Sequence, residues 1–280
     1  MVKTLDGEPI AMAVDQQGQS LYVATEVGVV LRTALADFRE TGRFVLPGPA
    51  CAKRLVASPT RSDVLLAFTG VCSTGAPGSE IVLISDLAVV GGAYVAEKNL
   101  FAFAPDGTTV FVYHGTMFPQ PTFVRLTAEP TGLRGLDAVA VDPGIAIDPD
   151  TDLEIGDDSI RLGHRIIDRQ SWSVVGSLDN ASGPCVRAAV TASWLCRPKA
   201  EPVRYLRSLS SYERTSRQLL NQVDYAFTFA ASELSYETGI QMSSGRPGEV
   251  LVARRGIRQD PYEGNKPRSE YRLVRSDLLR

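Results

Sequence analysis

Short apolar runs alternate with polar turn residues along almost the whole chain. Val, Ile, Leu, Phe, Tyr and Ala fill the runs, and Gly, Pro, Asp or Asn interrupts them. Interruptions about every 8–12 residues are typical of short strands joined by turns. Apolar residues at helical spacing are best developed at 212–223, where too few positions recur to specify a helix. The pattern predicts an all-β protein.

A two-strand unit recurs along the sequence. A strand of small apolar residues ends in an Asp, Pro or Gly turn and is followed by a more strongly apolar strand, as at 10–15, 54–59, 101–107 and 137–143. Weaker copies lie at 186–191 and 225–230. The residues that close the first strands are Val14, Ser58, Ala104, Val141, Val190 and Ala230. Their spacing of about 40–50 residues, with about four strands in each interval, is typical of a propeller blade.

The small residues have a steric explanation in such a fold. The innermost strands of all blades crowd around the central channel, where little volume is available for side chains. Six copies predict a single closed propeller over residues 1–280, with six four-stranded blades. Seven blades are the alternative, because the 280 residues also divide into blades of about 40 residues each.

One repeat carries a resemblance to known proteins. The segment Phe101-Ala-Phe-Ala-Pro-Asp-Gly-Thr-Thr-Val-Phe-Val112 resembles the repeat of YVTN-type and lactonase-like bacterial β-propellers, and residues 11–24 resemble it more loosely. The resemblance implies a fold and no particular activity, since this superfamily includes enzymes, binding proteins and scaffolds. The acidic and Asn metal-ligand pattern of gluconolactonase-type propellers does not align with this sequence.

Composition and charge narrow the class of protein. With 44% hydrophobic residues and a formal net charge of −3, the chain is expected to fold and to have no general attraction for nucleic acid or anionic membranes. No uninterrupted apolar run is long enough to predict a membrane-spanning helix. The first residues, 1–6, have no hydrophobic stretch of signal-peptide length.

The chain has four cysteines, Cys51, Cys72, Cys185 and Cys196. In the repeat scheme, each pair has one cysteine at the start of an innermost strand and the other at the end of the next, antiparallel strand. Cross-strand neighbours lie within disulfide reach, so we predict the bonds Cys51–Cys72 and Cys185–Cys196. Four buried free thiols are the alternative. Disulfides predict an extracytoplasmic protein, periplasmic or secreted, whose signal peptide is absent from this chain.

An acidic segment is a candidate calcium site. Residues 137–158 contain eight acidic side chains and neither Lys nor Arg. Carboxylates at alternate positions can turn their oxygens toward a hard cation such as Ca²⁺. Leu153 and Ser159 stand where a standard calcium loop has Gly and Glu, so a solvated acidic loop is the alternative. The candidate ligands are Asp148, Asp150, Asp152 and Asp157. No other cofactor is expected.

A second candidate site lies after the strand that ends at His114. Tyr113, His114, Met117 and Phe118 are expected to form an adaptable apolar lip for a ligand, on the same face as the disulfides. A loop packed on the neighbouring blade is the alternative. His114 is the one candidate for a catalytic residue, since no Gly-x-Ser-x-Gly or phosphate-loop motif is present.

Two function classes remain. The first is an exported, non-catalytic binding or scaffold module for a protein or glycan partner, which the lack of a recognisable catalytic motif favours. The alternative is a hydrolase, lyase or isomerase with its active site at the mouth of the central channel, using a bound cation or His114. Converging carboxylates around a deep axial pocket would favour the enzyme.

Overall fold

The computed structural model describes residues 9–15, 17–72, 78–96, 100–115, 120–144, 151–178, 181–187, 193–198, 206–213, 218–226, 236–244, 249–260 and 264–276. These residues form strands, turns and bends and contain no helix, which confirms the predicted all-β class. Accordingly, no helix long and apolar enough to cross a membrane occurs within these ranges.

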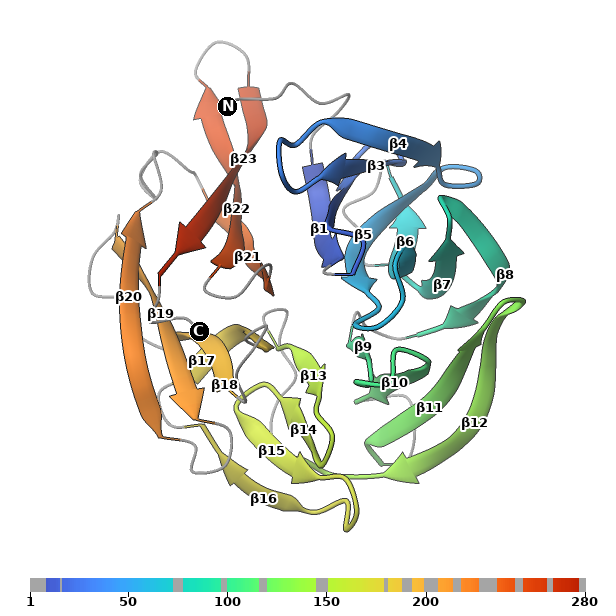
Figure 1. Ribbon diagram of the computed structural model, residues 1–280, viewed down its shortest axis with the longest axis vertical. Coiled ribbons are helices and arrows are strands. Elements are labelled where there is room, and N and C mark those ends of the chain that lie inside the picture. Colours follow the sequence, from blue (N-terminus) through green and yellow to red (C-terminus); the bar gives the residue numbers. More distant parts are fainter. Residues whose placement is uncertain are drawn as a thin grey trace. The chain divides into compact units, whose positions relative to one another are not determined.

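The described strands form antiparallel sheets in chain order (Figure 1). Sheet 1 contains β1 (Pro9–Asp15), β2 (Ser20–Thr25), β3 (Val29–Ala34) and β4 (Glu40–Val45). Sheet 2 contains β5 (Ala50–Ala57), β6 (Val64–Val71), β7 (Glu80–Ser85) and β8 (Ala88–Val95). Sheet 3 contains β9 (Phe101–Phe103), β10 (Thr109–His114), β11 (Thr122–Glu129) and β12 (Gly132–Ala140).

The remaining strands continue the same pattern. Sheet 4 contains β13 (Leu153–Ile155), β14 (Ser159–Leu162), β15 (Arg165–Asp168) and β16 (Val174–Ser177). Sheet 5 contains β17 (Ala181–Arg187), β18 (Ser193–Pro198), β19 (Leu206–Glu213) and β20 (Leu219–Ala226). The described part of sheet 6 contains β21 (Tyr236–Ser244), β22 (Glu249–Asp260) and β23 (Gly264–Arg275).

The chain forms two compact units. Unit 1 comprises Met1–Ile145, Leu153–Ile160 and Ile167–Ser173, and therefore includes sheets 1 to 3. Unit 2 comprises Ala146–Asp152, Arg161–Ile166 and Val174–Arg280, and therefore includes sheets 5 and 6. The residues of sheet 4 are divided between the two units.

Within unit 1, strand β6 of sheet 2 packs against apolar side chains on both faces. Leu65 and Ala67 of β6 belong to an apolar cluster shared with sheet 1, whereas Val64, Leu66 and Phe68 belong to a cluster shared with sheet 3. Successive residues of a strand point to opposite faces, so both sets must be apolar. This explains why β6 is a continuous apolar run rather than an alternating one.

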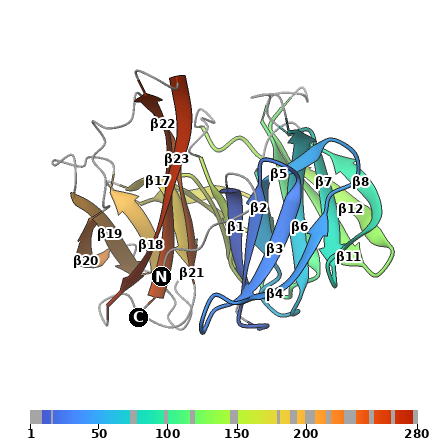
Figure 2. The ribbon, with the colours of Figure 1, turned by 90° about the horizontal axis from the view of Figure 1, so that it is seen from above.

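The first strands of sheets 1 to 3 are neighbours, as the small residues predict. β1 lies against β5, β5 against β9, and β9 against β13. Figure 2 shows the strands of sheets 1 and 2 running alongside one another. Ala11, Ala13 and Ala52 are buried where these strands meet.

The repeat positions are partly confirmed. Val14 lies in β1, and Ser58 and Ala104 directly follow β5 and β9, as predicted. The copy at 137–143 is wrong, because residues 137–140 end β12, the outer strand of sheet 3. The small residues here do not reflect crowding around a channel, since most of this segment faces solvent. The first strand of sheet 4 is β13 instead.

The last copies differ as well. The sequence pattern predicts a first strand at 225–230. Its first two residues are assigned wrongly, because Tyr225 and Ala226 end β20, the last strand of sheet 5. Ala230 and Val190 lie outside the described residues. Short alternations of small and aromatic residues suit an inner and an edge strand equally, so composition alone does not separate them.

Polar turn residues join the inner hairpins of sheets 1 and 2 to the next sheet. The buried Asp15 carboxylate accepts hydrogen bonds from the backbone N–H of Gly18 in its own turn and of Asp63 in the β5–β6 turn, each at 2.8 Å. In the same way, Ser58 donates its hydroxyl to the carbonyl of Gly107 at 3.2 Å. The Asp and Gly residues that mark the repeat therefore satisfy backbone groups between sheets.

The Asp63 carboxylate also forms an ion pair with Arg32. It accepts hydrogen bonds from the Tyr22 hydroxyl and, at 2.7 Å, from Arg32. Burial by itself raises the pKa of Asp63, but the hydrogen bonds from Tyr22 and Arg32 and the charge of Arg32 outweigh it, so the pKa lies below its ordinary value. Burial, followed by the hydrogen bond to Asp63, raises the pKa of Tyr22 above its ordinary value.

These shifts predict acid sensitivity. Because the folded pKa of Asp63 is lowered, the carboxylate stabilises the fold above its unfolded pKa of about 3.9, and this stabilisation is lost as the pH falls below that value. We expect Asp63→Asn to be less stable than the parent at neutral pH and to lose less stability on acidification. Urea unfolding from pH 7 to pH 2 measures this, with Asp224→Asn at an exposed position as the control. Parallel pH profiles for parent and Asp63→Asn would contradict it.

Candidate functional site

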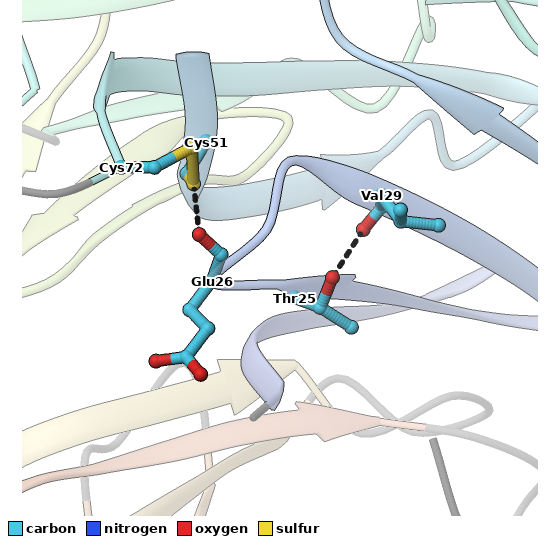
Figure 3. Close-up of a disulfide and its surroundings, with 5 residues drawn as sticks. All are labelled: Thr25, Glu26, Val29, Cys51 and Cys72. Carbon is cyan, nitrogen blue, oxygen red and sulfur yellow. Dashed lines mark hydrogen bonds between the residues drawn. A yellow bond between two sulfur atoms is a disulfide. The ribbon is translucent and has the colours of Figure 1, made fainter. Parts of the chain in front are cut away.

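The first predicted disulfide is present. Cys51 lies in β5 and Cys72 directly follows β6, with 4.9 Å between their Cα atoms (Figure 3). The backbone N–H of Cys72 donates to the carbonyl of Pro49 at 2.8 Å, which continues the pairing beyond the strand. We call this the disulfide end of unit 1: here β2, β4, β6 and β8 end, and β3, β5 and β7 begin.

The turn between β2 and β3 packs directly on the disulfide. The carbonyl oxygen of Glu26 lies 2.8 Å from the Cys51 sulfur (Figure 3). Gly28 has φ +80°, and a Cβ atom there would lie 2.6 Å from the carbonyl oxygen of Ala50 and 3.6 Å from the Cys72 sulfur. Glycine is therefore required at position 28, both for its backbone conformation and for the close approach of the two sheets.

His114 and Tyr113 lie in the interior at the end of β10. His114 is 4% exposed, and its Nε2 atom is 3.2 Å from the Tyr94 hydroxyl of the neighbouring sheet. Burial raises the pKa of Tyr94. Tyr113 is also buried, and its ring packs on Phe123 with 4.8 Å between ring centroids. Met117 and Phe118 lie outside the described residues, so the ligand-binding lip stays a prediction.

The acidic segment is partly described. Asp148 and Asp150 lie outside the described residues, Asp152 forms an ion pair with Arg161 at 3.4 Å, and Asp157 is exposed. Within the described ranges, no group of three or more His, Cys, Asp or Glu side chains could hold a metal ion. Calcium binding by Asp148, Asp150, Asp152 and Asp157 therefore stays a prediction.

Two arginines that follow the acidic segment in the sequence form an ion pair and hydrogen bonds with groups inside it. The guanidinium of Arg161 meets Asp152, and that of Arg169 donates to the carbonyl oxygens of Gly156 at 2.6 Å and Asp157 at 3.0 Å. Arg169 also lies over the ring of Phe111, at 5.2 Å from its centroid. Both arginines follow the acidic segment in the sequence, so the residues of the segment itself do not indicate them.

The second cysteine pair has the backbone register that a disulfide needs. Cys185 of β17 and Cys196 of β18 are direct cross-strand partners. Directly opposed residues of an antiparallel pair have Cβ atoms about 4.5–5.5 Å apart, close to the separation in disulfides. We expect a Cys185–Cys196 bond in protein from an oxidising compartment. Non-reducing peptide mapping should recover the two peptides joined, and free thiols at both positions would contradict this.

Four exposed apolar residues lie at the disulfide end and are not predictable from the sequence pattern. These residues are Val27, Val45, Val71 and Val95, whose exposed fractions range from 45% to 67%. Val27 lies in the β2–β3 turn, and the other three are the last residues of β4, β6 and β8. Valine is also the typical core residue of these strands, so composition gave no signal for their exposure.

No family model matches the chain, and no curated protein matches it either. Among solved structures, the chain is similar to BamB from Moraxella catarrhalis, with TM-score 0.49 and 11% identity over 98% of this chain and 76% of that chain. It is also similar to the WD40 domain of Neurospora crassa Pan2, with TM-score 0.54 and 9% identity over 96% of this chain and 79% of that chain. The chain has a propeller-like fold. At these identities the likeness concerns the fold alone.

Proposed function

We propose that the protein is an exported, non-catalytic β-propeller of six blades that binds a protein or glycan partner. The observation that carries this proposal is the position of the exposed large apolar side chains, which include Val27, Val45, Val71 and Val95. Four of them at one end of two adjacent sheets suit a surface that is covered in a complex.

The environment of His114 supports a non-catalytic role. A general acid or base must come within hydrogen-bond distance of its substrate. The imidazole is buried, and its Nε2 atom lies beside the Tyr94 hydroxyl. These contacts are those of a side chain that joins two sheets.

The disulfide supports export. Disulfides persist in oxidising compartments and are rare in the reducing cytosol of mesophiles. The Cys51–Cys72 bond links β5 to the end of β6 in sheet 2, and we expect it to contribute to folding stability. We therefore place the protein outside the cytoplasm, in the periplasm or in the secreted fraction.

Site-specific photo-crosslinking tests the binding role. A photoreactive residue at position 27, an exposed valine in the β2–β3 turn, is expected to capture a discrete partner from the extracytoplasmic fraction of the source cells. The same residue at position 174, an exposed valine of β16, is the control and should not capture that partner. Turnover of ester, lactone or glycoside substrates that is abolished by His114→Ala in a folded variant would overturn the non-catalytic assignment.

A further inference from the structure

The two sulfurs of the Cys51–Cys72 disulfide have different surroundings. Cys51 is 0% exposed and belongs to the apolar cluster that sheets 1 and 2 share. Cys72 is half-buried and packs against that cluster, directly after the last residue of β6. That last residue, Val71, is 45% exposed. A reagent in solution therefore reaches Cys72 more readily than Cys51.

A backbone carbonyl covers the Cys51 sulfur. The Glu26 oxygen lies 2.8 Å from Cys51 Sγ, and Figure 3 shows it on the side of that sulfur away from Cys72. A thiolate attacks a disulfide sulfur along the extension of the S–S bond, opposite the sulfur that leaves. The Glu26 oxygen occupies this approach to Cys51, and its partial negative charge repels an anionic attacking group.

Backbone hydrogen bonds hold the covering turn and the disulfide in place. The N–H of Gly28 donates to the carbonyl of Thr25 at 3.1 Å, and the N–H of Cys72 donates to the carbonyl of Pro49 at 2.8 Å. A Cβ atom at position 28 would lie 3.6 Å from Cys72 Sγ, so the turn lies close to this sulfur as well. The shielding of Cys51 therefore belongs to the folded protein and is lost when the chain unfolds.

We propose that Cys72 is a modification site, at which a low-molecular-weight thiol opens the disulfide. The thiolate forms a bond to Cys72 Sγ as the S–S bond breaks. The bonding electron pair leaves with Cys51 Sγ, which then takes a proton from water. The attacking sulfur is oxidised and Cys51 is reduced, so the step consumes no further oxidant or reductant. The product has a mixed disulfide at Cys72 and a thiol at Cys51.

The Glu26 carbonyl suits the product as well. In the oxidised protein the Cys51 sulfur carries no hydrogen to donate. After exchange it is a thiol, which is a weak hydrogen-bond donor, and the oxygen 2.8 Å away is in place to accept. Attack of Cys51 on Cys72 reverses the step and releases the small thiol. The modification is therefore reversible, and it is independent of the proposed binding function.

One effect opposes attack at Cys72. Attack at Cys51 would expel the Cys72 thiolate, which is better solvated, and a more stable leaving thiolate departs faster. The covering turn would first have to open, however, and that local opening costs free energy before each attack on Cys51. We therefore expect access to decide which sulfur reacts.

Glutathione exchange with the folded parent protein tests the inference. The oxidised parent is incubated with reduced glutathione, quenched with acid at early times, and analysed by peptide mapping at Cys51 and Cys72. We expect at least about tenfold more adduct on Cys72 than on Cys51. In urea above the unfolding transition the two yields should agree within about twofold, because the turn no longer covers Cys51.

Single-cysteine variants give the matched comparison. Cys51→Ser leaves the thiol of Cys72, and its serine hydroxyl can donate to the Glu26 carbonyl. Cys72→Ser leaves the thiol of Cys51. With oxidised glutathione, Cys72 should form its mixed disulfide at least about tenfold faster than Cys51, and urea should remove the difference. Where either variant does not fold, the parent measurement decides.

Three outcomes would overturn the inference. Equal adducts at both cysteines of the folded parent would show that the turn does not shield Cys51. A larger adduct at Cys51 would show that the stability of the leaving thiolate controls the attack. Adducts that form in urea but at neither cysteine of the folded protein would show that the disulfide opens only after unfolding.

Discussion

Replacing Cys51 and Cys72 together by serine is expected to lower the free energy of unfolding by about 3 kcal/mol. The bond closes a loop between residues 21 positions apart, so its loss restores conformational entropy to the unfolded chain. The bond joins β5 to the end of β6, a strand that contributes buried side chains to two apolar clusters.

Urea unfolding under non-reducing conditions measures this change. The parent treated with a reducing agent is the second arm and should approach the stability of Cys51→Ser/Cys72→Ser. A folded double variant with the unfolding midpoint of the oxidised parent would show that the bond adds nothing to stability. Cys51→Ser alone is not a suitable test, because it leaves a free thiol at Cys72.

The parts of the fold that depend on local patterns could be predicted from the sequence. The continuous apolar run of β6 predicts a strand, and the structure shows why it does not alternate. The small residues of β1 and the turn after β9 identify inner hairpins correctly. The cysteine positions relative to two such strands predict the Cys51–Cys72 bond.

The start of sheet 4 could not be predicted, because two features compete in one segment. Leu153 and Ile155 are buried with Glu154 between them, which is the alternation of a short strand. The surrounding aspartates dominate the composition and suggest a cation loop. Only the tertiary contact between β13 and β9 shows that the segment is an inner strand.

The candidate site depends on contacts between sheets. His114 ends a strand in the sequence, but its burial follows from Tyr94, which belongs to the neighbouring sheet. The exposure of Val45 and Val71 follows from their places at strand ends on one side of unit 1. Neither property is encoded in the residues next to these positions along the chain.

The second large effect is expected for Arg161→Ala. Arg161 is 0% exposed, pairs with Asp152 at 3.4 Å and donates to the carbonyl of Gly163 at 2.8 Å. The substitution removes the guanidinium that faces the Asp152 carboxylate and the Gly163 carbonyl, and breaking a buried ion pair costs about 3 kcal/mol or more. Asp152 retains some exposure, so we expect the lower end of that range.

Arg134→Ala is the matched control. Arg134 pairs with Glu129 at 2.7 Å, but 62% of its side chain is exposed, and exposed pairs contribute at most about 1 kcal/mol. Thermal and urea unfolding of both variants should therefore separate them clearly, with Arg161→Ala the less stable. Equal, small losses would show that water or a neighbouring donor replaces the Arg161 guanidinium. Because the substitution also removes the cation beside Asp152, calcium should protect Arg161→Ala more than the parent if the acidic segment binds Ca²⁺.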